Sequence, residues 1–325
     1  MRIALIYSGD GLDVVVLLIM LTFYNRIGYK TIYSKTFIDC HLLILPRPSD
    51  STIIPLNLIG TPIHVWNYVG NNLTKFFERN KENMHNVLYL NSSSELTPVN
   101  YQINESWHLQ ITKPPVYSKL WTCKLSENKK LNLIHIGNFK PYMKLKDDIF
   151  AQNFLKSLRA HKAHVWGRGW DSEEDIINEG VLEVLDVSKV YANSRAALGL
   201  MYPFQRQTTF SGRFWHGPLN GSIIISEPGI YTNDIPGVYN SDLTPINVQT
   251  AIESFGTRPE TIQDESVIYW DSHTENLEET VRTLTESFYT ETLKNFSNIN
   301  FYKKLIDNTL RNYYRQYRGK MRYIT

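Results

Sequence analysis

Apolar runs that predict strands alternate with helical stretches along most of the chain. Residues 2–7 form the first apolar run, residues 8–11 make a glycine-containing turn, and a helical stretch follows to about Arg26. A strand, a tight turn and a helix in this order are typical of the start of a Rossmann-like unit. Further strands are predicted at residues 29–34, 41–45, 62–67 and 86–90, and a polar helix at residues 73–81.

A second α/β pattern starts near residue 131. It follows an irregular stretch, residues 97–130, whose prolines interrupt any periodicity and whose end we interpret as an interdomain connection. We expect strands at residues 131–136, 163–166, 181–185, 196–201, 222–226 and 267–270. We expect helices at residues 147–161, 188–195, 211–220, 274–288 and 301–317.

The length of the chain favours two domains. Its 325 residues exceed what one hydrophobic core usually organises. The predicted fold class is therefore α/β with two Rossmann-like domains, at residues 1–125 and 126–298, followed by a C-terminal helix at residues 299–325.

Net charge, apolar runs and cysteine spacing limit which binding partners and which cellular location we expect. The formal net charge of +2 supplies no global basic field that would recruit nucleic acid. The longest apolar run, residues 14–23, is shorter than the roughly 20 residues of a membrane span, and Asp10 and Asp13 interrupt any signal peptide. The two cysteines have no metal-ligand spacing. These features predict a cytoplasmic protein without a metal site.

The richest chemistry lies between residues 190 and 229. A predicted strand, a polar loop with Arg206, and a helix that opens near Gly212 and carries Arg213 and His216 follow one another there. Backbone N–H groups at a helix start attract phosphate, and arginine holds phosphate groups by paired hydrogen bonds. Ligands of open α/β sheets bind beyond the carboxyl ends of the strands. The stretch therefore predicts a phosphate-binding site.

The same half of the chain resembles the C-terminal domain of GT-B glycosyltransferases, especially the CgeB-like group and, more distantly, the phage DNA glucosyltransferases. The resemblance covers residues 131–288. It is carried, in order, by IGNF at 136–139, HVWGRGW at 164–170, NSRAALGL at 193–200, RFWH at 213–216, NG at 220–221, SE at 226–227 and YWD at 269–271.

The resemblance implies two domains that face each other across a cleft, with a nucleoside diphosphate sugar as donor substrate and neither a cofactor nor a metal ion. It implies that Arg213 grips the diphosphate and that His216 replaces the acidic residue that holds the ribose. It also implies that the terminal helix crosses back onto the N-terminal domain. The further donor-binding candidates are Asn138, Lys140, Lys144, Gly167, Trp170, Arg206 and Gly212, of which Gly167 and Trp170 would line the base pocket.

The N-terminal domain would hold the acceptor beside the loop at residues 8–13. Asp10 and Asp13 are the candidates for the catalytic base that takes the proton of an acceptor hydroxyl. Asp13 has a second interpretation as a charge at the start of a helix. The catalytic aspartate of the phage enzymes has no counterpart at residues 68–71.

We therefore expect transfer of a sugar to a hydroxyl acceptor, a glycan or glycoconjugate. The alternatives are a nucleotide-sugar epimerase or hydrolase, a non-catalytic nucleotide- or glycan-binding protein, and a phage-type DNA glycosyltransferase. The near-neutral charge argues against a nucleic acid partner. The basic, tyrosine-rich residues 311–323 are interpreted as part of the terminal helix, or else as a peripheral contact with an anionic surface such as a membrane.

Overall fold

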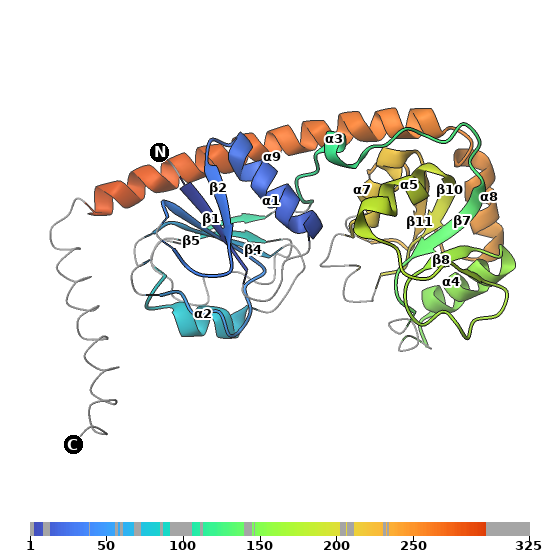
Figure 1. The fold of residues 1–325 in the computed structure, drawn as a ribbon, viewed down its shortest axis with the longest axis horizontal. Helices are drawn as coiled ribbons and strands as arrows, with labels where there is room; N and C mark the ends of the chain where they lie inside the picture. Colours follow the sequence, from blue (N-terminus) through green and yellow to red (C-terminus); the bar gives the residue numbers. More distant parts are fainter. Residues whose placement is uncertain are drawn as a thin grey trace, which may run out of the picture.

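Two parallel β-sheets lie side by side and one long helix runs past both of them (Figure 1). The structure is a computed structural model. It describes residues 3–8, 14–38, 40–55, 58, 61–67, 73–84, 87–91, 106–110, 113–139, 145, 147–201, 206, 211–229, 232 and 234–296.

The N-terminal sheet is parallel throughout, in the order β2-β1-β3-β4-β5-β6. Its strands are β1 (Ile3–Tyr7), β2 (Lys30–Ser34), β3 (Leu42–Pro46), β4 (Ile63–Asn67), β5 (Val87–Asn91) and β6 (Ser106–Gln110). Every residue of β3 and β4 is buried, as expected of central strands covered on both faces. Helix α1 (Val14–Arg26) covers one face and α2 (Thr74–Asn80) the other.

The C-terminal sheet has the order β12-β11-β10-β7-β8-β9 and is also parallel. Its strands are β7 (Leu131–Ile136), β8 (His164–Trp166), β9 (Ile177–Asn178), β10 (Ser194–Leu198), β11 (Ile223–Ser226) and β12 (Val238–Asn240). The helical segments around it are α4 (Ile149–Ala160), η4 (Val184–Asp186), α5 (Val187–Ala192), α7 (Arg213–His216), η5 (Pro218–Asn220) and α8 (Pro245–Phe255).

Three hydrophobic clusters hold these layers together. One lies under α2 in the N-terminal domain, and one lies under α4 and α8 in the C-terminal domain. The third is shared, because it joins residues of α1 and the N-terminal sheet to residues of α5, α7 and the C-terminal sheet. Trp270, Leu277 and Val281 of the long helix belong to this shared cluster.

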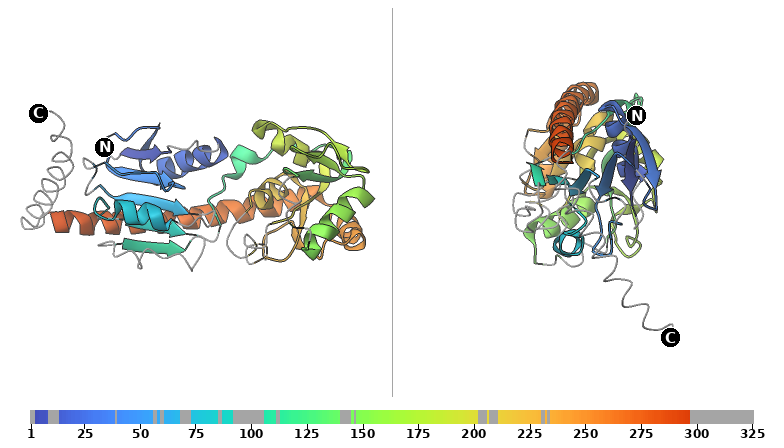
Figure 2. Two further views of the ribbon diagram at one scale, coloured as in Figure 1. Left: turned by 90° about the horizontal axis from the view of Figure 1, so that it is seen from below. Right: turned by 90° about the vertical axis from the view of Figure 1, so that its left-hand side faces the viewer.

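That long helix, α9 (Pro259–Phe296), is 38 residues in length and contacts both domains. Near its start, Gln263 Nε2 donates to Leu219 O at 2.9 Å in the C-terminal domain. Towards its end, Thr285 lies 3.4 Å from His64 Nε2 of the N-terminal sheet. Figures 1 and 2 show the helix alongside one domain and then the other. It therefore braces the two domains against each other.

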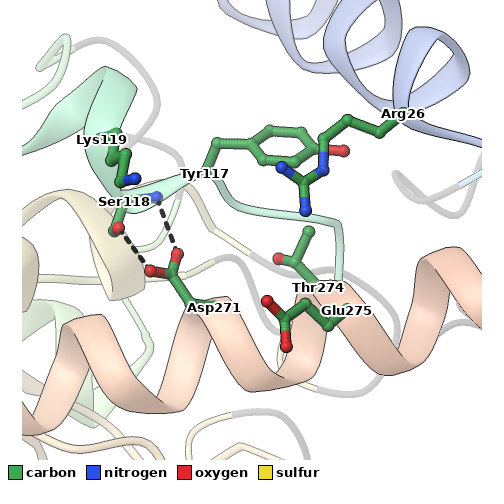
Figure 3. A pocket seen from close by; sticks show the side chains of 7 residues that line it. All are labelled: Arg26, Tyr117, Ser118, Lys119, Asp271, Thr274 and Glu275. Atoms are coloured by element: carbon green, nitrogen blue, oxygen red, sulfur yellow. Dashed lines mark hydrogen bonds between the residues drawn. The ribbon is translucent and has the colours of Figure 1, made fainter.

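The connection between the domains is fastened to α9. It contains α3 (Ser118–Trp121), and the side chain and backbone N–H of Ser118 both donate to Asp271. Tyr117 Oη and Arg26 Nε donate to the same oxygen of the buried Glu278, at 2.7 and 2.6 Å. A small pocket lies where α1, the connection and α9 meet (Figure 3). This junction links both domains to one helix.

Most predicted strands are confirmed, with shifts of one to three residues, and three predictions are wrong. Residues 181–185 are largely exposed and end in η4, because charged neighbours keep this short apolar run at the surface. Residues 267–270 lie inside α9 rather than in a strand. The helix predicted at 211–220 is two short pieces, since Pro218 begins a new 3₁₀ turn.

Several elements have no counterpart in the predictions. Strands β6, β9 and β12 are short or carry polar residues. Helix α8 begins with Pro245, and a proline in the sequence suggests the interruption of a helix as readily as its first turn. The helices predicted at residues 299–325 and 301–317 lie outside the described residues. The crossing to the N-terminal domain that was expected of this tail is made by α9.

Candidate functional site

The carboxyl edge of the C-terminal sheet has a topological switch point. β7 lies between β10 on one side and β8 on the other, so the chain winds in opposite directions from it. The loops that leave neighbouring strands on either side of such a point diverge and open a crevice for ligands. Gly137 directly follows β7 and Gly199 directly follows β10, and neither residue has a side chain that would fill the space between the two loops.

Arg213 of α7 lies across this point. Its Nη1 donates to Leu200 O at 3.3 Å. A Cβ atom on Gly199 would lie 2.9 Å from Arg213 Cδ and 3.1 Å from Nη1, so the guanidinium occupies the space that this glycine leaves empty. The side chain is half-buried, and no carboxylate of the described residues forms an ion pair with it. The arrangement presents a partly desolvated positive charge at the edge of the sheet.

A buried histidine lies beside this charge. His135 of β7 is fully buried, and its Nδ1–H donates to Leu198 O at 2.8 Å. Burial, with a smaller contribution from the nearby Arg213 charge, lowers the pKa of His135 to about 3. The imidazole is therefore neutral at pH 7, and Arg213 provides the positive charge at this point.

Two loops of the same edge touch through their backbones. Gly167 has φ +144°, and a Cβ atom there would lie 2.1 Å from Gly137 O. Asn138 Oδ1 accepts from Arg168 N at 2.8 Å, which ties the loop after β7 to the loop after β8. Gly167 therefore has a packing role, and Asn138 is exposed at this edge of the sheet.

Trp170 does not offer a face to a nucleotide base. Its side chain is 1% exposed, its Nε1–H donates to Gly137 O at 2.7 Å, and its ring packs against Phe139 and His135. The interpretation of this residue as part of a base pocket is corrected to that of a core residue supporting the loop after β7.

Arg206 is held by two carboxylates. It bridges Asp148 of the α4 N-terminus, at 2.9 Å, and Glu227 after β11, at 3.1 Å. Glu227 is fully buried and also accepts from Met201 N at 2.6 Å. Because both partners are acidic, the guanidinium is already neutralised. Arg206 braces the loops of the sheet edge instead of offering an unpaired charge to a diphosphate.

His216 points into the protein. Its ring stacks on Trp215, with 3.5 Å between centroids, and meets the edge of Trp121 from the interdomain connection. Burial lowers the pKa of His216 to about 3, and its Nδ1 has no hydrogen-bond partner among the described residues. The expected contact with a ribose is thus replaced by packing between α7 and α3.

The structure gives less support than expected to phosphate binding by the backbone N–H groups at the start of α7. Gly212 is exposed at the N-cap of α7, but α7 is only four residues long, and a single turn carries little of the dipole of a long helix. The remaining candidates, Lys140, Lys144, Asp10 and Asp13, lie outside the described residues. In the sequence, the two aspartates lie between the end of β1 and the start of α1.

Gly199, Glu227 and Asp148 were not among the predicted site residues. Their roles depend on partners far away in the sequence, so no local pattern reveals them. The one available signal is the position of Glu227 directly after the predicted buried strand 222–226, whereas Gly199 lies inside the predicted strand 196–201.

No group of three or more His, Cys, Asp or Glu side chains that could hold a metal ion occurs in the part of the chain that the structure describes. Across the same residues, every helix is too short or too polar to cross a membrane.

The two parallel sheets, the switch point and the bracing helix define the class of fold. The chain has the two-domain GT-B architecture that is known from glycosyltransferases. It resembles a DNA-modifying β-glucosyltransferase solved with and without uridine diphosphoglucose, with a TM-score of 0.60 and 11% identity over 89% of this chain and 100% of that one.

Two further solved structures are similar. AviGT4, a glycosyltransferase involved in avilamycin A biosynthesis, has a TM-score of 0.58 and 12% identity over 90% of this chain and 98% of its own. An α-glucosyltransferase in complex with UDP and DNA that contains an HMU base has a TM-score of 0.56 and 12% identity over 87% of this chain and 99% of its own. No family model and no curated protein matches the chain.

Proposed function

We propose that this protein is a glycosyltransferase that moves a sugar from a nucleoside diphosphate sugar to a hydroxyl acceptor. The observation that carries the proposal is Arg213, a half-buried cation that spans the switch point and has no carboxylate partner among the described residues. A diphosphate is the ligand chemistry that such a group fits, because arginine binds phosphate oxygens through paired charge-assisted hydrogen bonds.

A uridine diphosphate sugar is the first donor to test, since structures with this fold have been solved with uridine diphosphoglucose and with UDP. Gly137, directly after β7, has no side chain and would let the pyrophosphate approach the backbone closely. The N-terminal domain would present the acceptor from the opposite side, with Asp10 or Asp13 as the base.

Thermal-shift measurements with a panel of nucleotides and nucleotide sugars test the donor. A ligand present at a hundredfold excess over its Kd stabilises the folded state by about 2.7 kcal/mol. We expect a shift for wild type and for Arg195→Ala, whose exposed arginine lies at the other end of β10, and a much smaller shift for Arg213→Ala. If no nucleoside diphosphate compound shifts the wild type, the proposal fails.

Product analysis then separates the alternatives. A transferase releases nucleoside diphosphate and joins the sugar to an added acceptor, whereas an epimerase or hydrolase changes the donor without an acceptor. A binding protein shows the thermal shift but no turnover. We propose a glycan or glycoconjugate acceptor, and DNA with a hydroxymethylated base belongs in the same panel because DNA-modifying enzymes share the fold.

We further propose that the leaving diphosphate is neutralised by Arg213 and backbone N–H groups without a resident metal ion. One structure with this fold, from phage T4, holds UDP together with Mn²⁺, so the alternative is concrete. Turnover that is unchanged by EDTA supports the proposal, and turnover that requires added Mn²⁺ contradicts it.

A further inference from the structure

One surface of the C-terminal domain is both acidic and apolar. It is the segment 171–186, with sequence DSEEDIINEGVLEVLD, which contains no lysine or arginine. The segment includes β9, the last strand of the sheet, which pairs with β8 on one side only. We call residues 171–186 the acidic strip. An edge strand with a free side offers backbone N–H and C=O groups to another chain.

Apolar side chains stand out from the acidic strip. Ile177, Val181, Val184 and Leu185 are 43%, 66%, 41% and 77% exposed. Clusters of exposed aliphatic side chains often mark interaction surfaces, whereas single exposed aliphatic residues are common on any protein surface. These four lie within nine positions of each other, so the strip combines an apolar contact area with an open edge.

Part of the negative charge of the acidic strip is unbalanced. Glu173, Glu179 and Asp186 are paired with Arg159, His164 and Lys189. Asp171, Glu174, Asp175 and Glu183 form no ion pair with a described residue, and all four are exposed. A partner for this surface therefore needs positive charge together with apolar or aromatic side chains.

The chain itself contains a segment of this chemistry. Residues 311–323, RNYYRQYRGKMRY, interleave arginine and lysine with tyrosine and contain no aspartate or glutamate. We call them the basic tail. The sequence led us to expect that this tail packs on the N-terminal domain, but α9 makes that contact.

The geometry of α9 favours a tail from another molecule. The helix starts at the C-terminal domain, and its 38 residues carry the chain about 57 Å away, past the N-terminal domain (Figure 1). Residues 297–310, fully extended, span at most about 50 Å. Residues 297–310 are thus shorter than α9, so the basic tail of the same chain could return to the C-terminal domain only with this stretch almost fully straight.

We propose that the acidic strip is the docking surface for the basic tail of a second copy of this chain. The tail would lie along the open edge of β9, with arginines facing Glu174, Asp175 and Glu183 and tyrosines covering Val181 and Leu185. Reciprocal exchange of tails closes a dimer. The proposal does not depend on the glycosyltransferase function.

Sedimentation equilibrium of the full chain tests it at low and high salt. We expect a dimer in low salt with a Kd of about 1 μM, and at least about tenfold weaker association in 0.5 M salt, because screening weakens exposed charge pairs. The double variant Glu174→Lys/Glu183→Lys and the double variant Arg315→Glu/Arg318→Glu are each expected to be monomeric. Their combination in one chain restores opposite charges and is expected to dimerise again.

Glu253→Lys/Glu279→Lys is the matched control, since it reverses two exposed charges on α8 and α9 away from the strip. Its dimer should be unchanged, and all variants should keep the wild-type melting temperature. A wild type that is monomeric at about 100 μM in low salt overturns the proposal. So does a dimer that survives either charge reversal when it is made alone.

Two other occupants would appear as distinct results. A monomer in which tail reversal alters the fluorescence of a probe at position 185 places the tail on its own strip. Binding of the basic tail to phosphatidylserine vesicles, with no dimer in solution, assigns it to a membrane surface. Either outcome contradicts exchange between copies.

Discussion

The position of Arg213 depends on a residue that has no side chain. Gly199 ends β10 without a Cβ, and the arginine lies in the space above it at the switch point. The position of the charge is therefore set by two residues fourteen positions apart: Arg213 carries the charge, and Gly199 leaves space for it because it has no Cβ. This pair offers a way to move the guanidinium without removing it.

Gly199→Ala is expected to weaken donor binding about tenfold or more, which corresponds to about 1.4 kcal/mol, because the new methyl group displaces Arg213 from the sheet edge. The measurement is the Kd of UDP or a UDP-sugar by calorimetry.

If Gly199 acts through Arg213, the double variant Gly199→Ala/Arg213→Ala binds no more weakly than Arg213→Ala alone. Additive losses would show that the glycine contributes independently of the arginine.

Three buried imidazoles make stability depend on pH. Burial lowers the pKa of His64, His135 and His216 to about 3 each, while the unfolded chain titrates near 6.5. Below pH 6.5 the unfolded state binds more protons, so the free energy of unfolding falls as the pH drops towards 3. Between pH 7 and pH 5 each histidine is expected to remove about 2 kcal/mol.

Urea unfolding at several pH values checks this expectation. His216→Leu should reduce the loss between pH 7 and 5 by about 2 kcal/mol, because it removes one titrating group, whose Nδ1 has no partner in the part of the chain that the structure describes. A wild type whose stability is constant over this range would contradict the assignment of neutral imidazoles.

The sequence identified some of these residues and misplaced others for a common reason. Arg213 stands out locally, because a cation at a helix start after a buried strand is visible in the sequence itself. His216 and Trp170 were assigned by their place in a motif, but the linker residue Trp121 and the loop residue Phe139 decide their burial. Those contacts are tertiary and leave no local pattern.

At the scale of elements, continuous apolar runs located the central strands well. β3, β4 and β11 are buried on both faces, so their sequences have no alternation to misread. Peripheral elements were harder to predict, because the two-residue β9 and the exposed residues 181–185 are set by their position at the edge of the sheet.

The α4 N-terminus joins these elements through Asp148. Its carboxylate caps the helix by accepting from Ala151 N at 3.0 Å and pairs with Arg206, which reaches Glu227 after β11. Asp148→Ala is expected to destabilise the protein by about 2–4 kcal/mol, because it removes a cap and one side of a partly buried ion pair.

The neighbouring Asp147→Ala, at an exposed position outside the cap, is the control and should change stability by less than about 0.5 kcal/mol. Chemical denaturation measures both variants. Equal effects would show that the network around Arg206 adds nothing to stability.

At the scale of the whole molecule, one carboxylate joins both domains. Glu278 of α9 accepts from Arg26 of the N-terminal domain and from Tyr117 of the connection. Arg26 is half exposed, so most of the effect of removing Glu278 comes from the buried hydroxyl of Tyr117, which is left without a partner.

Glu278→Ala is expected to lower stability by about 1–3 kcal/mol and to split thermal unfolding into two transitions as the domains uncouple. The next residue provides the control, since Glu279→Ala removes only an exposed pair with Arg282. Scanning calorimetry distinguishes the two, and a single unchanged transition in Glu278→Ala would show that the junction does not couple the domains.

The shared cluster around α9 has a consequence for how the protein is made. Trp270, Leu277 and Val281 complete a core that includes Ala4 and Ile6, so these two residues wait for partners that are synthesised more than 260 positions later. Nascent chains that end before α9 would hold much of the sheet surface uncovered. Synthesis of this protein therefore includes a long interval in which part of the N-terminal core lacks its native cover, and we expect chains truncated before α9 to aggregate more readily than the full chain.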